Sequence, residues 1–427
     1  LAEAALARGA PRQALALAEH ALAAVDDAAR AATAALLAAR AALVLGDYPR
    51  ARAALVRADG DPARHTAARL VAARVAQRAG DLDGAEAILD ALVTAAPVDA
   101  ELHGARARLL VARGRYREAI ATVAAVEPVP ATAAGALCAE ARATAHLYLG
   151  ELEAAGIHVT TALAIGQATG DDAVRARALV VRGMLAQAHG DLLAATVLYR
   201  DATAAARVGG DGHCAAVALQ NQAAALAERG LHGAALPVLT AATAELVGLG
   251  KVAELAAVDA NRAVSLLACG HADAAATAAA AALGRATAAG LPVPRFYARL
   301  VQGDLAAGRG ADVDAAAHYR AAWDDAVAAG LPDRGHAQRG LAEVATDAAT
   351  AAAALAAVAA LDSDDDDRAR TLLARGRVAR RGLATEPTPP LVAGLTAIAE
   401  RARDSGRHDR AWRALAIAAA LAATAGE

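Results

Sequence analysis

The chain has 427 residues, of which 141 are alanine and only nine are aromatic. Alanine has the highest helix propensity, whereas strands prefer β-branched and aromatic side chains, so this composition predicts an all-α protein and excludes large sheets. The 43 Lys and Arg residues are balanced by 46 Asp and Glu residues, and Lys251 is the single lysine. Because this leaves no basic field for a phosphate backbone, we expect no nucleic-acid binding.

A glycine followed five positions later by an alanine recurs along most of the chain. From Gly9 to Gly310 the successive intervals are 37, 34, 34, 36, 40, 40, 40 and 40 residues. This regularity predicts an internal structural repeat. The pairs are Gly9/Ala14, Gly46/Ala51, Gly80/Ala85, Gly114/Ala119, Gly150/Ala155, Gly190/Ala195, Gly230/Ala235, Gly270/Ala275, Gly310/Ala315 and Gly406/Ala411.

Each repeat is predicted to consist of two helices. A second set of glycines lies 20 residues after the first set in the later repeats, at Gly170, Gly210, Gly250, Gly290 and Gly330. Glycine adopts the left-handed backbone that commonly ends a helix, so we expect the first set to end a helix A and the second set to end a helix B.

Polar residues are expected at the start of each helix. The acidic residue that follows several glycines of the first set is predicted to cap helix B, as at Asp47, Asp81, Glu151 and Asp191. Between repeats the sequence predicts short polar loops, such as Asp171-Asp172 and Asp211-Gly212-His213.

Small residues accompany the first set of glycines at a second fixed offset, seven positions earlier. They are Ala39, Ala73, Ala107, Ala143, Gly183, Ala223, Ala263 and Gly303. Small side chains here, and five positions after the glycine, let two helices approach closely.

This pattern resembles the tetratricopeptide repeat over roughly residues 1–360. The resemblance implies an all-α fold, an α-α superhelix or solenoid of about ten helix-turn-helix repeats, right-handed and with helices A lining a concave groove. The 40-residue repeats are similar to the sensor arrays of large bacterial transcription activators or signalling kinases.

The regular spacing ends after Gly330. Thr346-Asp347 occupies the place where the next glycine is due, although Ala351 keeps the five-residue offset. We therefore expect a regular array (1–346), an irregular repeat with an insert (347–390) and a terminal helical hairpin (391–427).

Both ends of the chain also carry expectations. Trp412 is expected to be an anchor between the two helices of the hairpin, and the run 386–390 to break the chain before it. Leu1 stands only eight residues before Gly9, so the first helix A is expected to be truncated and the parent protein to continue upstream.

The insert contains an acidic run, 362–367, followed by an arginine-rich stretch, 368–381, which is expected to be helical. The run resembles a calcium loop superficially, but its sixth position is Asp367 instead of Gly and its twelfth is Leu373 instead of Glu. We predict a solvated loop whose acids cap the following helix, with a docking patch as the alternative.

No sequence motif predicts catalysis, a metal or a cofactor. Lys251 lies in no phosphate-binding loop, and His213-Cys214 and Cys269-Gly270-His271 lack a second pair of ligands at zinc spacing. The three cysteines, Cys138, Cys214 and Cys269, are far apart, which favours a reducing compartment and buried thiols. The most apolar window, 348–361, is too short for a bilayer, so we expect no membrane association and a cytoplasmic protein.

The candidate binding residues are three arginines, each six positions before a glycine of the first set: Arg40, Arg74 and Arg108. By resemblance to the family this position faces the concave groove, and stacked helices would place the guanidinium groups about 10 Å apart, a spacing that suits an extended acidic peptide. The alternative is that these arginines only cover apolar surface with their stems. We call these three residues the arginine column.

In later repeats the position six residues before the glycine is no longer arginine, and in one of them it is Met184. Asn221 and Asn261 lie three positions earlier in adjacent repeats, where family members use asparagine to bind a peptide backbone through its donor and acceptor together. Surface asparagines without a ligand are the alternative.

The sequence therefore predicts a non-catalytic scaffold or sensor region that binds a protein or peptide on its concave face. The resemblance to regulator arrays implies a larger bacterial signalling protein, with a kinase, ATPase or DNA-binding region fused upstream. Two alternatives stay open: a free-standing adaptor, and an enzyme on a helical toroid, which would need carboxylates or histidines converging from several repeats.

Overall fold

The structure of the chain is a computed structural model, which describes residues 1–427 except 8–9, 332–333, 362–364, 384–387, 405–407 and 426–427. The described residues form 23 α-helices and contain no strand, which confirms the predicted all-α class. They divide into two compact units, unit 1 (Leu1–Val252) and unit 2 (Ala253–Glu427).

Unit 1 contains α1 (Ala2–Ala7), α2 (Pro11–Ala24), α3 (Ala28–Val44), α4 (Tyr48–Ala58), α5 (His65–Arg78), α6 (Leu82–Ala95), α7 (Ala100–Ala112), α8 (Tyr116–Ala124), α9 (Ala133–Tyr148), α10 (Leu152–Thr169), α11 (Asp172–Ala188), α12 (Leu192–Val208), α13 (Gly212–Glu228) and α14 (His232–Gly248). Unit 2 contains α15 (Leu255–Ala268), α16 (Ala272–Ala288), α17 (Pro292–Gly308), α18 (Asp312–Ala328), α19 (Gly335–Glu343), α20 (Ala348–Ala359), α21 (Asp365–Arg380), α22 (Thr388–Asp404) and α23 (His408–Ala425).

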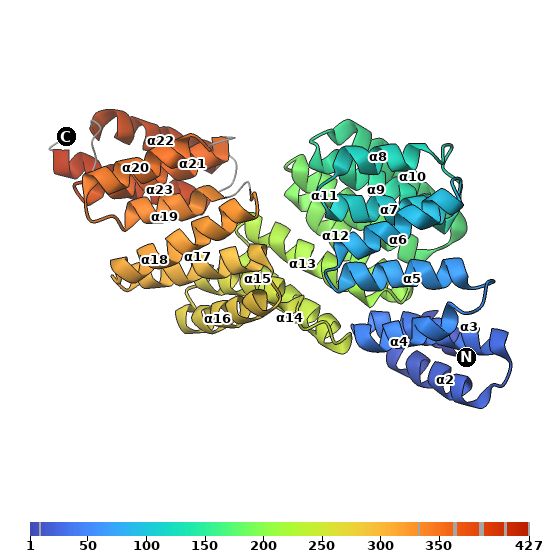
Figure 1. Ribbon diagram of the computed structural model, residues 1–427. Coiled ribbons are helices and arrows are strands. Elements are labelled where there is room, and N and C mark those ends of the chain that lie inside the picture. Colours follow the sequence, from blue (N-terminus) through green and yellow to red (C-terminus); the bar gives the residue numbers. More distant parts are fainter. Residues whose placement is uncertain (8–9, 332–333, 362–364, 384–387, 405–407, 426–427) are drawn as a thin grey trace. The chain divides into compact units, whose positions relative to one another are not determined.

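Within each unit, consecutive helices pack against each other as hairpins (Figure 1). Helices A of neighbouring repeats also touch, as α7 does with α9, α9 with α11, and α15 with α17. Because neighbouring hairpins within each unit pack on one another, the described helices form the superhelical solenoid that the repeat predicts.

The glycines end the helices as predicted. From Gly46 to Gly330, every glycine of the two sets that the sequence pattern selects has a positive φ, between 63° and 86°. At Gly190 the backbone N–H donates to Gln187 O at 2.9 Å, and the N–H of Asp191 donates to Ala186 O at 2.9 Å. These two bonds satisfy carbonyl groups that the end of α11 would otherwise leave without a partner.

The predicted caps are confirmed at three of the four acidic residues. Asp47, Asp81 and Asp191 each accept the backbone N–H three residues ahead, with distances of 2.8 to 3.1 Å. Glu151 makes no such bond. Its longer side chain instead accepts from His146 Nδ1 at 2.6 Å.

The polar loops predicted between repeats are shorter than expected. Asp171 caps α11, accepting the N–H groups of Ala173 and Val174 at 3.0 Å, and Asp172 is already helical. Asp211 in the same way caps α13, which begins at Gly212. The glycine ends one helix and the short acidic side chain that follows it caps the next helix. No longer loop is therefore needed between them.

Small residues form the packed seam between helices A and B. The alanines five positions after the glycines from Gly46 to Gly310 are 0 to 1% exposed. Where helix A has Gly183, helix B supplies the buried ring of Tyr199, and a methyl group on the glycine would lie 2.5 Å from a ring carbon. Gly303 and Tyr319 repeat this relationship at 2.6 Å. A large residue on one helix is therefore accommodated by the smallest one on its partner.

The irregular region, in which the regular spacing of glycines is lost, is also helical. Asp347 caps α20, accepting the N–H of Thr350 at 2.8 Å, and Ala351 is fully buried. The predicted arginine-rich helix is present as α21, while residues 362–364 of the acidic run lie outside the described residues. The predicted break at 386–390 is partly wrong, because α22 begins at Thr388. Proline is tolerated in the first turn of a helix, where its missing N–H has no partner.

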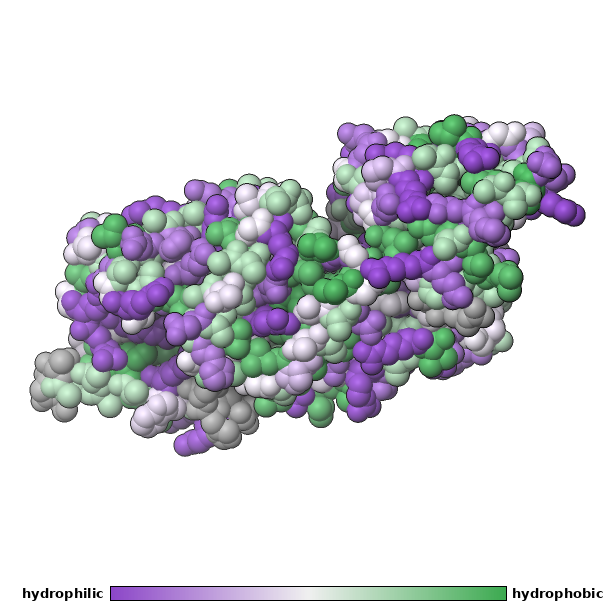
Figure 2. Space-filling model, turned by 90° about the horizontal axis from the view of Figure 1, so that it is seen from below, coloured by the Kyte–Doolittle hydropathy of each residue, from purple (hydrophilic) through white to green (hydrophobic). Residues whose placement is uncertain are grey.

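The prediction for Trp412 is wrong. Its side chain is 71% exposed, and Leu395 and Ile417 are among the residues that pack between α22 and α23 instead. Over the visible face in Figure 2, hydrophilic and apolar residues are interspersed in small patches, as is usual for a water-exposed surface. Within the described residues, no helix combines the length and the apolar character needed to cross a bilayer.

Candidate functional site

The arginine column lies on helices A of unit 1, with Arg40 on α3, Arg74 on α5 and Arg108 on α7. All three residues are exposed, whereas the alanine that precedes each of them is 0 to 1% exposed. The arginines therefore border the packed seam between helices and keep their charged groups at the surface.

The electrostatics of Arg74 indicate that these groups share one surface. Burial lowers the pKa of Arg74 from its ordinary value, although Glu101 raises it. The positive charges of Arg108, Arg40 and Arg177 lower this pKa further. The side chain nevertheless keeps 45% of its area exposed. Arg74 is therefore close enough to Arg40, Arg108 and Arg177 for their charges to act on it, while its side chain stays open to water.

Arg177, on α11, is a member of this surface that the sequence pattern did not select. Burial opposes its charge, but the carboxylates of Glu140 and Asp211 raise its pKa. Its guanidinium lies 3.2 Å from the former and 3.4 Å from the latter. The two carboxylates hold Arg177 in place and offset much of its charge.

A signal for Arg177 exists in the sequence at a second offset. Arg177 and Glu101 both lie thirteen residues before the glycine of their repeat, seven residues before the position of the arginine column. Seven residues are close to two helical turns, so both positions lie on the same face of helix A. A sequence pattern that combines both positions includes Arg177 among the candidate binding residues.

The charge of this surface is only partly balanced. Arg74 pairs with Glu101 at 3.4 Å. In the part of the chain that the structure describes, Arg40 and Arg108 pair with no carboxylate. Two guanidinium groups thus remain available, one on either side of Arg74, and both can bind an anion without breaking an existing ion pair.

The other predicted binding residues do not all belong to this unit. Met184, on α11, and Asn221, on α13, are partly buried side chains of unit 1. Asn261, on α15, is a partly buried residue of unit 2. The arginine column, Met184 and Asn221 therefore belong to one compact unit, and Asn261 belongs to the other.

The three cysteines differ in their burial. Cys138 and Cys214 are buried as predicted, and burial raises their pKa values to about 11 and about 12, which keeps both thiols protonated. The prediction was wrong for Cys269, which is exposed because it caps the end of α15 beside Gly270. Among the described residues, no group of three or more His, Cys, Asp or Glu side chains could hold a metal ion.

Residues 57–109, which include α5 and most of α7, match the family model described as tetratricopeptide repeat. A comparison with curated protein sequences finds no match. Three solved structures are similar in fold. The human IFIT1 dimer with m7Gppp-AAAA is 13% identical, with a TM-score of 0.54 over 92% of this chain and 90% of that chain.

A Rap protein complexed with Competence and Sporulation Factor is 14% identical, with a TM-score of 0.51 over 84% of this chain and 99% of that chain. Aspartyl phosphate phosphatase F from Bacillus subtilis is 11% identical, with a TM-score of 0.50 over 80% of this chain and 96% of that chain. At such identities the likeness shows the fold alone. Together with the repeated hairpins, it shows an all-α superhelical solenoid fold, within which residues 57–109 match the tetratricopeptide-repeat model.

Proposed function

We propose that the chain is a non-catalytic interaction scaffold and that unit 1 binds an extended, acidic peptide or protein segment along the arginine column. The observation that supports this proposal best is the gathering of like charges around Arg74. Holding Arg40, Arg74 and Arg108 near one another disfavours the unbound state, and an acidic partner would relieve that repulsion.

The uncharged residues of the same unit suit the rest of a peptide. Met184 offers a flexible, polarisable side chain for apolar contacts, and Asn221 offers a donor and an acceptor for a peptide backbone. The Rap protein named above was solved with Competence and Sporulation Factor bound, which gives one example of a similar fold in complex with a factor. On the resemblance of the 40-residue repeats to regulator arrays, we also propose a sensor role in a larger bacterial signalling protein of the cytoplasm, fused to a kinase, ATPase or DNA-binding region.

A direct titration tests the binding proposal. Purified chain is titrated into two fluorescently labelled peptides of equal length, one of alternating Glu and Gly and the other of alternating Lys and Gly. The proposal predicts saturable binding of the acidic peptide that weakens as salt is raised, and no saturable binding of the basic peptide. Equal binding of both peptides, or of neither, would overturn it.

The same titration distinguishes an acidic peptide from a phosphate-bearing ligand. Because the human IFIT1 structure contains m7Gppp-AAAA, that molecule is added as a competitor. The proposal predicts that it displaces the peptide weakly or not at all. Displacement at lower concentration than the unlabelled acidic peptide would assign the arginine column to nucleic acid instead.

A further inference from the structure

A hollow of about 500 Å³ lies in unit 2. It is bounded by α16, α17 and α18 and by the turn that joins the last two helices. We call it the α17 hollow. Its apolar wall is built of small residues and one leucine, namely Ala276, Leu305, Ala306, Ala311 and Ala317. Its volume is in the range of small-molecule sites.

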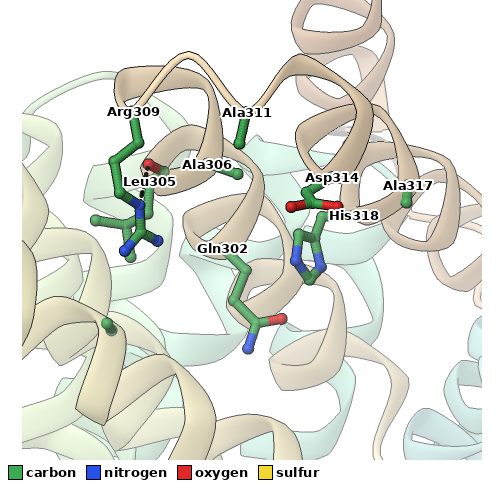
Figure 3. Close-up of a pocket in the computed structure, with 9 residues that line it drawn as sticks. Gln302, Leu305, Ala306, Arg309, Ala311, Asp314, Ala317 and His318 are labelled. Carbon is green, nitrogen blue, oxygen red and sulfur yellow. Dashed lines mark hydrogen bonds between the residues drawn. The ribbon is translucent and has the colours of Figure 1, made fainter.

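The floor of the hollow carries an amide group that lacks a protein partner. The Oε1 atom of Gln302, on α17, is buried and accepts no hydrogen bond from any described residue. Leaving such an atom without a partner costs about 1–3 kcal/mol, so the fold tolerates a polar group here that it does not itself use. Figure 3 shows the amide of Gln302 extending into the hollow.

A guanidinium group stands on one side of this amide. Arg309, which ends α17, donates from Nε to Leu305 O at 3.1 Å. This bond fixes the side chain and leaves the two terminal nitrogens free of it. Among the described residues Arg309 pairs with no carboxylate, and Figure 3 shows its guanidinium on the side of the hollow opposite α18.

A carboxylate and an imidazole stand on the other side. Asp314 and His318 are one turn apart on α18, and in Figure 3 they lie next to each other with the imidazole toward the hollow. Neither side chain has a hydrogen-bond or ion-pair partner within the described part of the chain. The hollow therefore has a positive group at one side, a negative group at the other and an unsatisfied amide between them.

A related hollow in unit 1 lacks this arrangement. It is bounded by the corresponding helices α10, α11 and α12 and includes Arg175 and Asp201. There, however, Arg175 already pairs with Asp172 at 2.9 Å, and Asp201 pairs with Arg200 at 3.1 Å. Arg182 also lines this hollow without a carboxylate partner among the described residues, but no unpaired carboxylate lines it on the other side. The repeat geometry accounts for the presence of a hollow, but it does not account for the unpaired charges in unit 2.

We propose that the α17 hollow binds a small zwitterion of amino-acid or dipeptide size. Arg309 binds the carboxylate of the ligand, and Asp314 binds its ammonium group. The Gln302 amide, whose Oε1 has no partner among the described residues, turns toward the hollow to accept a hydrogen bond from the ligand. Opposite charges at two separated sides of one hollow select a ligand whose own charges are separated, in preference to a simple anion or cation. The alanine wall leaves room for an apolar side chain of the ligand.

The test is calorimetric titration of the whole chain with the common amino acids and a set of glycine-containing dipeptides. The ligand concentration is raised to about 5 mM, so that binding with a millimolar dissociation constant is detected. Each ligand that binds is repeated as its N-acetylated and C-amidated forms. The proposal predicts saturable binding of at least one zwitterion, weakened about tenfold or more by blocking either end. Absence of binding across the whole panel, or equal binding of the blocked forms, would overturn it.

Three variants locate the site. Arg309→Gln is expected to weaken binding about tenfold or more. Gln302→Leu is expected to abolish binding while leaving the thermal midpoint unchanged or raised, because it removes a polar atom without a partner. Arg320→Gln removes an exposed arginine of α18 that does not line the hollow, and should bind like the wild type. Wild-type affinity in the first two variants would place any bound ligand elsewhere.

Discussion

Arg74 and Arg177 lie on helices α5 and α11, with five helices between them in the chain, and yet the charge of one lowers the pKa of the other. The stacking of unit 1 must therefore bring distant helices A toward a common side. A second contact agrees with this: a methyl group added to Gly250, just after α14, would lie 3.2 Å from the carbonyl oxygen of Leu45, just after α3. The curvature of the array thus concentrates charges that the sequence distributes widely.

The ion pair between Arg74 and Glu101 should limit the affinity for an acidic peptide. Glu101→Gln is expected to tighten binding about two- to five-fold, since it frees a third guanidinium and removes a repelling charge. The control is Glu153→Gln, which removes an exposed carboxylate from a helix B, α10. The peptide titration compares the two variants, and an equal effect of both would mean that only net charge matters.

Gly303, a glycine of the packed seam in unit 2, should be required for the stability of α17. A methyl group on Gly303 would lie 2.6 Å from the ring of Tyr319, and a methyl group on Gly340 would also lie 2.6 Å from it, so the ring packs closely against two glycines. Gly303→Ala is expected to destabilise α17 by about 1–3 kcal/mol, measured by hydrogen exchange of its amide groups.

Gly284→Ala is the matched control for that substitution. Gly284 lies within α16 with open space around its Cβ position, so alanine there should stabilise the helix by about 0.5–1 kcal/mol. If Gly303→Ala were as well tolerated as Gly284→Ala, the fit between the glycine and the tyrosine ring would not be a constraint.

Several helices B lack the side-chain cap that Asp191 gives to α12, and α16 is one of them. His271 occupies the capping position of α16 with φ −88° and ψ 66°, close to the −81° and 73° of Asp191, but makes no capping bond. His271→Asp is expected to raise the free energy of unfolding by about 1 kcal/mol, whereas Asp191→Ala should lower it by about 0.5–2 kcal/mol. Thermal unfolding of both variants checks this, and a loss of stability in His271→Asp would contradict it.

These features were predictable to different degrees. Features that depend on local geometry were predictable, because the same local pattern recurs in successive repeats. These features are the glycine turns, the small residues of the seam and the caps at Asp47, Asp81 and Asp191. The exposure of Trp412 and the position of Arg177 depend on which helices meet across the superhelix, and a single repeat does not specify that. The tyrosine rings beside Gly183 and Gly303 were missed because the small and large partners lie on different helices.

Stability should depend on pH through His158. Its ring stacks on that of His146, with centroids 5.3 Å apart. Burial lowers the pKa of His158 to about 4, and the charges of Arg142 and His146 contribute in the same direction. Because the folded pKa is below the unfolded value of about 6.5, the unfolded chain binds the proton more readily between these two values, and stability falls as the pH falls from 6.5 toward 4.

Replacing the imidazole should remove this dependence. Relative to the wild type, His158→Gln is expected to gain on the order of 1 kcal/mol as the pH is lowered from 7 to 4, a figure reduced for the solvent that reaches the ring. Thermal midpoints measured for both proteins across this range provide the comparison. If the difference in thermal midpoint between the two proteins did not change with pH, His158 would have the same pKa in the folded and unfolded states, which would contradict the prediction.

The central claim is that the arginine column is the binding surface of unit 1. It is tested most directly by titrating the acidic peptide with the triple variant Arg40→Ala, Arg74→Ala, Arg108→Ala and with a control of equal net charge, Arg52→Ala, Arg57→Ala, Arg117→Ala, which removes exposed arginines from α4 and α8. We predict an affinity about tenfold or more weaker for the first variant and a change of less than about two-fold for the control. Equal affinities of the two variants would contradict the account.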